Sequence, residues 1–256
     1  MGKSKIIDLS VTTVNNPPGS FTVAEITYIL HEESAKTRSK ALNLPEDFFP
    51  DNRLAAEEVA KLSTHAGTHF DAPWHFSVTT EGKPAKTIDE IPLEWCYGDG
   101  VVLDFSYKKA GELISAEDVQ QALVKISYKL KPFDIVLIRT DASKHYAEPG
   151  YENMHPGMGR ESTLWLTEQG IKVMGIDAWG WDRPFSVMMK EYQESGDKSG
   201  FLAAHFVMRE REYCHLENLA NLDLIPAPHG FKVAVFPVKL KAASAGWVRA
   251  VAILSE

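Results

Sequence analysis

Hydrophobic and polar positions along the chain form short strand-like patterns separated by helical or turn-rich segments. Residues 101–105, 133–139 and 173–176 are apolar runs typical of buried strands. Residues 21–30 alternate between apolar and polar positions, which predicts a half-buried strand. The other predicted strands are residues 5–9, 231–238 and 248–254.

Two helices are predicted between these strands. One begins at Ser115, where Asp118 lies three residues later and forms an approximate capping box, with Asp in place of the usual Glu or Gln. The other covers residues 163–169 and ends before Gly170, since glycine suits the left-handed position after a helix C-terminus.

Strand–helix–strand alternation occupies the middle of the chain, with β-hairpin material at both ends. We therefore predict an α/β fold, in which residues 1–256 form a single domain with a mixed, partly barrel-like β-sheet flanked by helices. Residues 144–161 contain two prolines and three glycines and are predicted to be a long loop. Loops of this length are usually functional or mobile, so a role as a lid stays open.

Composition narrows the class of protein. The 256 residues are 44% hydrophobic and 24% charged, as in an ordinary globular enzyme. The net charge of −8 argues against nucleic acid as a partner, because binding to phosphates needs a basic footprint. Cys96 and Cys214 are too few for a disulfide framework and are expected to be small buried hydrophobes.

The apolar stretches are too short for membrane or export segments. None approaches the roughly 20 residues that a membrane span needs. The stretch near the N-terminus is broken at Asp8 and is too short for the apolar region of a signal peptide. We therefore expect a cytoplasmic protein with no membrane partner.

The residues that carry chemistry are concentrated in residues 65–75. Three of the nine histidines lie in this window, where uniform scattering would put about 0.4. They are His65, His69 and His75, with Asp71 among them. Imidazole and carboxylate groups are suitable ligands for Zn²⁺, Mn²⁺ or Fe²⁺.

The local backbone favours a shared ligand site over a helix. Gly67 and Pro73 both disfavour a regular helix, so the side chains are expected on a tight turn that can wrap around one ion. His75 lies four residues beyond Asp71, where a proton-transfer group would be useful.

Other candidate residues have weaker support when each is taken alone. A single histidine such as His205, in an apolar run, is more often structural than a ligand, and a lone Glu217 is more often an exposed acid. For the three histidines and the aspartate within residues 65–75 the expectation is the opposite. Clustered side chains of this kind are costly to bury unpaired, so a ligand role is favoured. Trp74, Trp179 and Trp181 are more often core than pocket residues unless the substrate is aromatic.

The motif His-x-Gly-Thr-His-x-Asp-x-Pro-x-His resembles the signature of the metal-dependent cyclase-like hydrolase family, which includes bacterial kynurenine formamidases and isatin hydrolases. Further segments resemble this family along essentially the whole chain. They are Ile7-Asp8-Leu9-Ser10, His155-Pro156-Gly157, Gly175-Ile176-Asp177, His205 with Glu217-Asn218-Leu219, Pro237 and Val248-Arg249-Ala250. The resemblance implies hydrolysis of a formamide or cyclic amide in a small, aromatic substrate, such as isatin or N-formylkynurenine.

The resemblance also implies a role for each residue of the motif. His65, His69 and Asp71 match a first metal site, and His75 matches the catalytic histidine. A divalent ion at this site would lower the pKa of a bound water towards about 7 and polarise the carbonyl of the substrate. His75 would take the proton of the water and deliver it to the leaving nitrogen.

The number and identity of the ions stay open at this point. In the formamidase branch Asp71 would bridge to a second ion held by His205 and Glu217, whereas in the isatin hydrolase branch a single Mn²⁺ is expected. We therefore expect one or two ions, Mn²⁺ or Zn²⁺. Family members are usually homo-oligomers, so we expect a dimer or tetramer. For an aromatic substrate the candidate contacts are Trp74, Trp179, Trp181 and His215.

Three alternatives remain beside amide hydrolysis. A lyase, a cyclising dehydratase or a lactone hydrolase could use the same metal site. An Fe(II) oxygenase would use His69, Asp71 and His205 as a two-histidine, one-carboxylate triad, in which His65 would be superfluous. A metal-binding module without catalysis would bind the ion and show no turnover.

Overall fold

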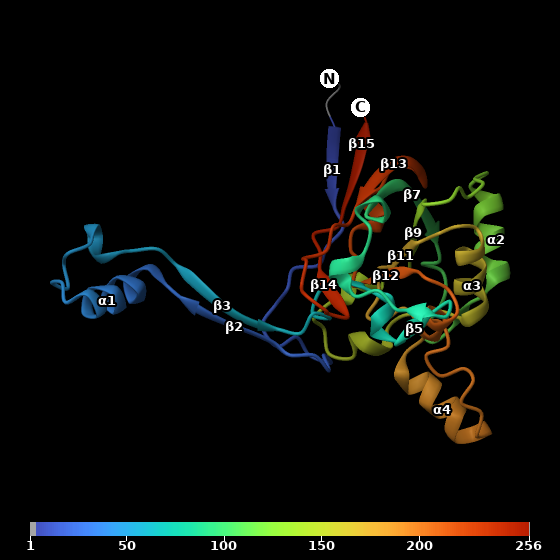
Figure 1. Ribbon diagram of the computed structural model, residues 1–256, viewed down its shortest axis with the longest axis horizontal. Coiled ribbons are helices and arrows are strands. Elements are labelled where there is room, and N and C mark those ends of the chain that lie inside the picture. The colour runs from blue at the N-terminus through green and yellow to red at the C-terminus, as the bar shows by residue number, and fades with distance from the viewer. Residues whose placement is uncertain (1–3, 256) are drawn as a thin grey trace.

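The computed structural model describes residues 4–255, which form an α/β fold around one large mixed sheet (Figure 1). Nine strands lie in the order β1-β15-β13-β7-β9-β11-β12-β4-β14. Their bounds are β1 (Ser4–Asp8), β4 (His69–Asp71), β7 (Tyr97–Asp104), β9 (Ile135–Arg139), β11 (Val173–Ile176), β12 (Cys214–Glu217), β13 (His229–Ala234), β14 (Ala245–Trp247) and β15 (Val251–Ser255). The neighbours among β7, β9, β11 and β12 are parallel, and the outer pairs are antiparallel. The sheet curls into a half-barrel, which confirms the predicted fold class.

Three two-stranded sheets and four α-helices complete the described residues. The small sheets pair β2 (Ala24–Ile29) with β3 (Glu57–Leu62), β5 (Thr79–Thr80) with β6 (Lys83–Pro84), and β8 (Leu113–Ile114) with β10 (Gly157–Met158). The helices are α1 (His31–Leu42), α2 (Ala116–Lys125), α3 (Arg160–Glu168) and α4 (Phe185–Ser195). Within residues 4–255 no helix is both long and apolar enough to pass through a membrane.

Both predicted helices are present, and their ends have clear physical causes. The predicted capping box is formed at α2, where the Asp118 backbone N–H donates to Ser115 Oγ at 3.1 Å and the Ser115 N–H donates to Asp118 Oδ2 at 2.8 Å. α3 begins three residues earlier than predicted, and Ser162 Oγ accepts a hydrogen bond from the Gly159 N–H at its start. Gly170 follows α3 with φ of +86°, as a residue without Cβ allows.

The central strands are buried on both faces, which explains their nearly continuous apolar sequence. In β9, Ile135 and Leu137 pack into one hydrophobic cluster, whereas Val136 and Ile138 pack into the cluster on the other face. α2 and α3 cover this second face (Figure 1). Successive strand residues point to opposite faces, so a strand between two cores needs apolar residues at every position.

Residues 24–62 form an arm that extends away from the sheet (Figure 1). The arm is the β2–β3 ribbon with α1 at its tip, and the sequence predicted neither α1 nor β3. The strand predicted in residues 21–30 is present, but its partner is β3 and not the core. Burial alternates over residues 24–27, as predicted for a half-buried strand, whereas Tyr28 is exposed because the strand lies on the arm and not in the core.

The segment predicted as a long loop, residues 144–161, is tied into the fold at several points. It includes β10, which pairs with β8, and the start of α3. Tyr151 and His155 are buried within it, and the Tyr151 hydroxyl donates to Asn218 Oδ1 at 3.0 Å. The segment is therefore packed along much of its length.

Candidate metal centre and active site

Two antiparallel strands bring together most of the candidate ligands. In the register of β4 and β12, Asp71 lies opposite His215 and His69 lies opposite Glu217. Residues two apart in a strand project from the same face, so the His-x-Asp and His-x-Glu spacings place all four side chains on one side of the ladder. All four residues are buried, because the strands lie within the sheet.

The turn before β4 carries His65 to the same centre. Gly67 has φ of +65°, and a Cβ built on it would lie 2.7 Å from Thr13 Oγ1, so both conformation and space require glycine here. His69 Nδ1 lies 2.9 Å from the Gly67 carbonyl oxygen, which fixes the ring and directs Nε2 to the centre. A tight turn therefore lies between the two histidines, as predicted. His69 and Asp71, which were also expected on the turn, instead lie on strand β4.

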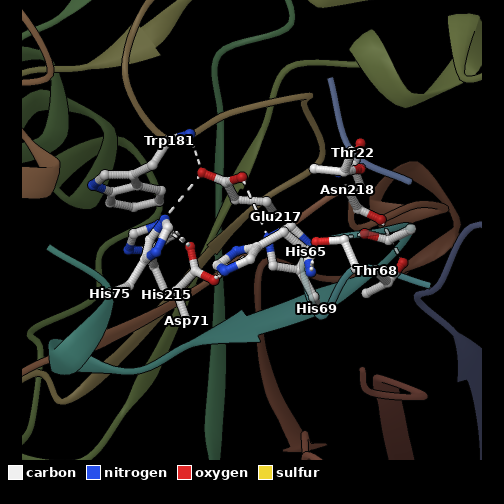
Figure 2. Close-up of polar contacts among 12 residues, drawn as sticks. Thr22, His65, Thr68, His69, Asp71, His75, Trp181, His215, Glu217 and Asn218 are labelled. Carbon is white, nitrogen blue, oxygen red and sulfur yellow. Dashed lines mark hydrogen bonds and ion pairs between the residues drawn. The ribbon is translucent and has the colours of Figure 1, made fainter. Parts of the chain in front are cut away.

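Asp71 lies between two groups of candidate ligands (Figure 2). His65 Nδ1 lies 3.0 Å and His69 Nε2 lies 3.5 Å from Asp71 Oδ1. On the other oxygen, His215 Nε2 lies 3.3 Å and His75 Nε2 lies 3.8 Å from Asp71 Oδ2. The carboxylate can thus offer one oxygen to each of two neighbouring ions.

One group combines Asp71 with His65 and His75, whose ligand atoms lie within 4.8 Å of one another. His65 and His75 are only half-buried and their rings lie 4.1 Å apart between centroids. His75 belongs to a short 3-10 turn, Pro73–His75, directly after β4. This group therefore faces the accessible side of the centre.

The second group combines Asp71 with His205, His215 and Glu217, and all four residues are buried. His205 Nε2 lies 3.3 Å from Glu217 Oε1, and His215 Nε2 lies 3.4 Å from the same oxygen. Asp182, which the sequence analysis did not single out as a ligand or partner, accepts from His205 Nδ1 at 2.5 Å. The predicted distal pair is thus close to the histidine cluster in space.

Several polar atoms of this centre converge without forming hydrogen bonds within the described residues. His69 Nε2, both Asp71 oxygens and both nitrogens of His215 are buried with no hydrogen-bond partner among residues 4–255. Burying a carboxylate and imidazoles in this way costs several kcal/mol unless a cation compensates. Imidazole and carboxylate are also ligands that Zn²⁺ and Mn²⁺ accept, so the residues fit a divalent ion.

The electrostatics of the protein alone favour ionised carboxylates. Burial opposes ionisation of Asp71, but the charges of His75 and His69 hold its pKa well below the usual value. Burial likewise opposes ionisation of Glu217, whereas the adjacent imidazoles of His205 and His215 lower its pKa. Both groups are therefore anionic and ready to bind a cation.

The histidines respond differently to this environment. Burial lowers the pKa of His75 to about 4, so its imidazole is neutral at neutral pH. His205 is buried too, which by itself lowers its pKa, yet Asp182 and Glu217 raise it to about 10. An ion bound by His205 must therefore displace a proton from it.

A cavity of about 260 Å³ opens onto the centre. His65, His69, His75, His205 and Glu217 lie at one end of it. The wall includes Phe76, Tyr146, Trp179, Phe185 and Leu202, so the cavity is mostly apolar. Such a combination of apolar walls and a few converging polar groups is typical of a small-molecule site.

Of the four predicted substrate contacts, only Trp179 lines this cavity. Trp74 is 41% exposed and does not line it. Trp181 is fully buried, its indole N–H donates to Thr163 Oγ1 and its backbone N–H donates to Glu217 Oε1. His215 is fully buried beneath the cavity.

Sequence reasoning missed the aromatic wall around Trp179. Phe21 packs edge-on against Trp179 with centroids 5.6 Å apart, and Phe185 does so at 5.8 Å. Phe185 lines the cavity, whereas Phe21 does not line it and only packs against Trp179. Both lie far from the histidine motif in sequence, and an isolated Phe has no signal that distinguishes a cavity wall from a core.

The fold and the centre together define a metal-dependent hydrolase. The model of the family described as putative cyclase matches residues 7–183. A kynurenine formamidase from Bordetella petrii is 30% identical over 202 residues, covering 79% of this chain and 82% of that protein. The chain therefore belongs to the cyclase family of metal-dependent hydrolases, as its sequence resemblance predicted.

Solved structures show that the whole fold is shared. An isatin hydrolase bound to the product analogue thioisatinate has a TM-score of 0.76 at 20% identity, covering 99% of this chain and 93% of that one. Isatin hydrolase A from Labrenzia aggregata, bound to benzyl benzoate, has a TM-score of 0.75 at 23% identity and covers 99% and 94%. At these identities the similarity establishes the fold alone.

Proposed function

We propose that this protein hydrolyses the amide bond of a small aromatic substrate, a formamide or a cyclic amide such as N-formylkynurenine or isatin. The observation that carries the proposal is the cavity itself, which ends at the metal centre and has Trp179 and Phe185 in its wall. Aromatic side chains favour an aromatic ligand through stacked or edge-to-face packing.

The charge of the wall favours a neutral cyclic amide over N-formylkynurenine. Arg183 is the only Lys or Arg among the residues that line the cavity. Both of its terminal nitrogens donate hydrogen bonds to the carboxylate of Glu191, at 2.7 and 2.6 Å. The cavity therefore offers no free cation for the carboxylate of an amino-acid substrate, within the described residues.

The proposed metal ligands are the residues that converge on Asp71. His65, His69 and Asp71 would hold a first ion, and His205 and Glu217 would hold a second one next to it. The ion is Zn²⁺ or Mn²⁺, and when bound it lowers the pKa of water and polarises the carbonyl of the substrate.

The proton-transfer residue in this proposal is His75. Its ring lines the cavity, and its low pKa keeps it unprotonated at neutral pH. Nε2 can therefore accept a proton from the attacking water and then donate it to the leaving nitrogen.

The test is turnover by metal-reconstituted protein on isatin, N-formylkynurenine and small lactones, with product masses measured. We expect an amide substrate to gain one water, and metal-depleted protein to lose the activity. Loss of water from the substrate would indicate a lyase, and oxygen consumption would indicate an oxygenase. Absence of amide turnover by fully loaded protein would contradict the proposal.

We also propose that the chain is a cytoplasmic homo-oligomer that assembles through the arm of residues 24–62. Cys96 and Cys214 are free and buried, which is consistent with a reducing compartment. The isolated chain exposes 13552 Å², whereas a compact monomer of this mass exposes about 11,300 Å². A standard interface covers about 800 Å² per partner, so the excess suffices for one.

The arm of residues 24–62 is best suited to bind a second copy of the chain. Tyr28 and Val59 lie on opposite faces of the β2–β3 ribbon and are both 56% exposed. An isolated two-stranded ribbon is marginally stable in water and therefore needs a partner. A second copy of the chain is always present in an equal amount, so it is the partner that stabilises the ribbon best.

We expect a dimer or tetramer in light scattering for the wild type, and a monomer for the double variant Tyr28→Lys with Val59→Lys. The control Val124→Lys, at a site 78% exposed on α2, should not change the mass, and a monomeric wild type would contradict this assembly.

A further inference from the structure

His215 is a buried imidazole that the roles proposed above leave unused. It lies in β12 directly opposite Asp71, and it is fully buried. Neither ring nitrogen has a hydrogen-bond partner among the described residues. Leaving such a group unsatisfied costs about 1–3 kcal/mol, so an imidazole here needs a compensating interaction.

The ring of His215 is held in one orientation by its aromatic neighbours. Trp181 stacks on it with centroids 5.4 Å apart and planes 19° apart, and Tyr213 stacks at 5.9 Å and 29°. His205 meets it edge-on at 4.6 Å. This packing directs Nε2 towards Asp71 and Glu217, as Figure 2 shows.

The spacing of the surrounding atoms matches a coordination shell. His215 Nε2 lies 3.3 Å from Asp71 Oδ2 and 3.4 Å from Glu217 Oε1, and His205 Nε2 lies 3.3 Å from that same Glu217 oxygen. Ligand atoms at about 2.0–2.1 Å from a tetrahedral Zn²⁺ are about 3.3–3.4 Å from one another. The three separations therefore match three of the six edges of such a tetrahedron, and all four ligand atoms lie within 4.8 Å of one another.

We propose that His215 Nε2 is a metal ligand and that, with Asp71, His205 and Glu217, it forms a closed four-ligand site for a divalent cation such as Zn²⁺. This inference rests on the proposed metal-dependent function and adds a ligand to its second site. Because four buried side chains fill a tetrahedral shell, this site has no open position for substrate. The open position belongs to the neighbouring site at His65 and His69, which faces the cavity.

The two sites therefore have different tasks. The closed ion fixes Asp71 and Glu217 and compensates their buried charge, since both carboxylates contribute to its shell. The open ion is the one that water and substrate can reach. The closed ion is expected to bind more tightly, because four buried protein side chains hold it.

The decisive variant is His215→Phe, which keeps an aromatic ring between Trp181 and Tyr213 but removes the ligand nitrogen. The matched control is His155→Phe, because His155 is also fully buried with an unpartnered Nε2 and belongs to neither ligand group. Elemental analysis after dialysis against Zn²⁺ gives the number of ions per chain. Chelator competition gives the affinity of each site, and the absorption spectrum of Co²⁺-substituted protein reports four-coordinate geometry.

We expect two ions per chain in the wild type and in the control, and one in His215→Phe. The affinity of the closed site should fall at least about 100-fold, with loss of the four-coordinate Co²⁺ spectrum. If His215→Phe does not fold, as judged by circular dichroism, His215→Gln supplies a weaker oxygen ligand and should lower that affinity about 10-fold.

The outcomes separate this inference from the proposed function. Two ions of unchanged affinity in His215→Phe, or a single ion in the wild type, overturn the role of His215 and leave metal-dependent hydrolysis standing. A wild type that binds no divalent ion overturns both.

Discussion

Asp182 offers a sharp test of how this centre is assembled, because it touches no candidate ion directly. Its Oδ2 accepts from both the backbone N–H and Nδ1 of His205, at 3.0 and 2.5 Å. Its Oδ1 accepts from the Ala204 N–H at 2.8 Å. This arrangement holds one His205 proton on Nδ1, so the proton that a metal ion displaces is the one on Nε2, and that nitrogen becomes the ligand.

Replacing Asp182 with Asn keeps the size of the side chain and changes this arrangement. An Asn has one acceptor, so if its oxygen serves His205, its amino group faces the Ala204 N–H, and two donors then oppose each other. Losing a hydrogen bond to a charged group costs about 1.5–3 kcal/mol of stability. The less basic and less oriented His205 should also weaken metal binding about 10–100-fold, which is about 1.4–2.7 kcal/mol.

The assay combines chelator competition on the loaded protein with chemical denaturation of the metal-free protein. We expect Asp182→Asn to lower both the affinity of the site that contains His205 and the free energy of unfolding. The stability loss alone, with metal affinity unchanged, would show that Asp182 serves the fold and does not orient a ligand. No change in either quantity would refute the reasoning from these three hydrogen bonds.

Three further predictions follow from single residues. His75→Ala should keep its metal content and lower kcat about 10²–10⁴-fold, and loss of metal would instead make His75 a ligand. Gly67→Ala should lower the free energy of unfolding by about 1–3 kcal/mol in chemical denaturation, because φ is +65° and Thr13 leaves no space; an unchanged value would contradict this. Burial raises the pKa of Asp177 from 3.8 to about 6, so the folded state retains a proton that the unfolded state loses. The free energy of unfolding should therefore fall by about 2 kcal/mol relative to Asp177→Asn as pH rises from 4 to 6.5, and parallel pH profiles of the two proteins would contradict this prediction.

Much of the centre was predictable because its geometry is local. The clustering of His65, His69 and Asp71 indicated a shared centre, and these side chains do converge, although His69 and Asp71 lie on a strand that the sequence did not predict. The glycine at position 67 indicated a turn, and the structure has that turn. These conclusions need only the neighbours of each residue along the chain.

The errors arose where a pattern has more than one physical cause. Apolar and polar residues alternate over residues 21–30, as in a half-buried strand. This alternation does not indicate whether the strand packs against the core or lies on an arm that extends from it. Trp181 is an aromatic residue of the kind that often lines pockets, yet it is fully buried and its backbone N–H donates to Glu217. A tryptophan buries a large apolar area in either setting.

The sequence by itself determined the class of chemistry, since the ligand types and their spacing within residues 65–75 depend only on the local chain. It also determined the α/β class, through apolar runs that must be buried on both faces. Only the tertiary structure decided that β12 lies antiparallel to β4, which turns Asp71 into the shared centre of two ligand groups and brings His215 to it. Strand pairing between distant segments depends on packing across the whole sheet, and no local pattern specifies which partner a strand will have.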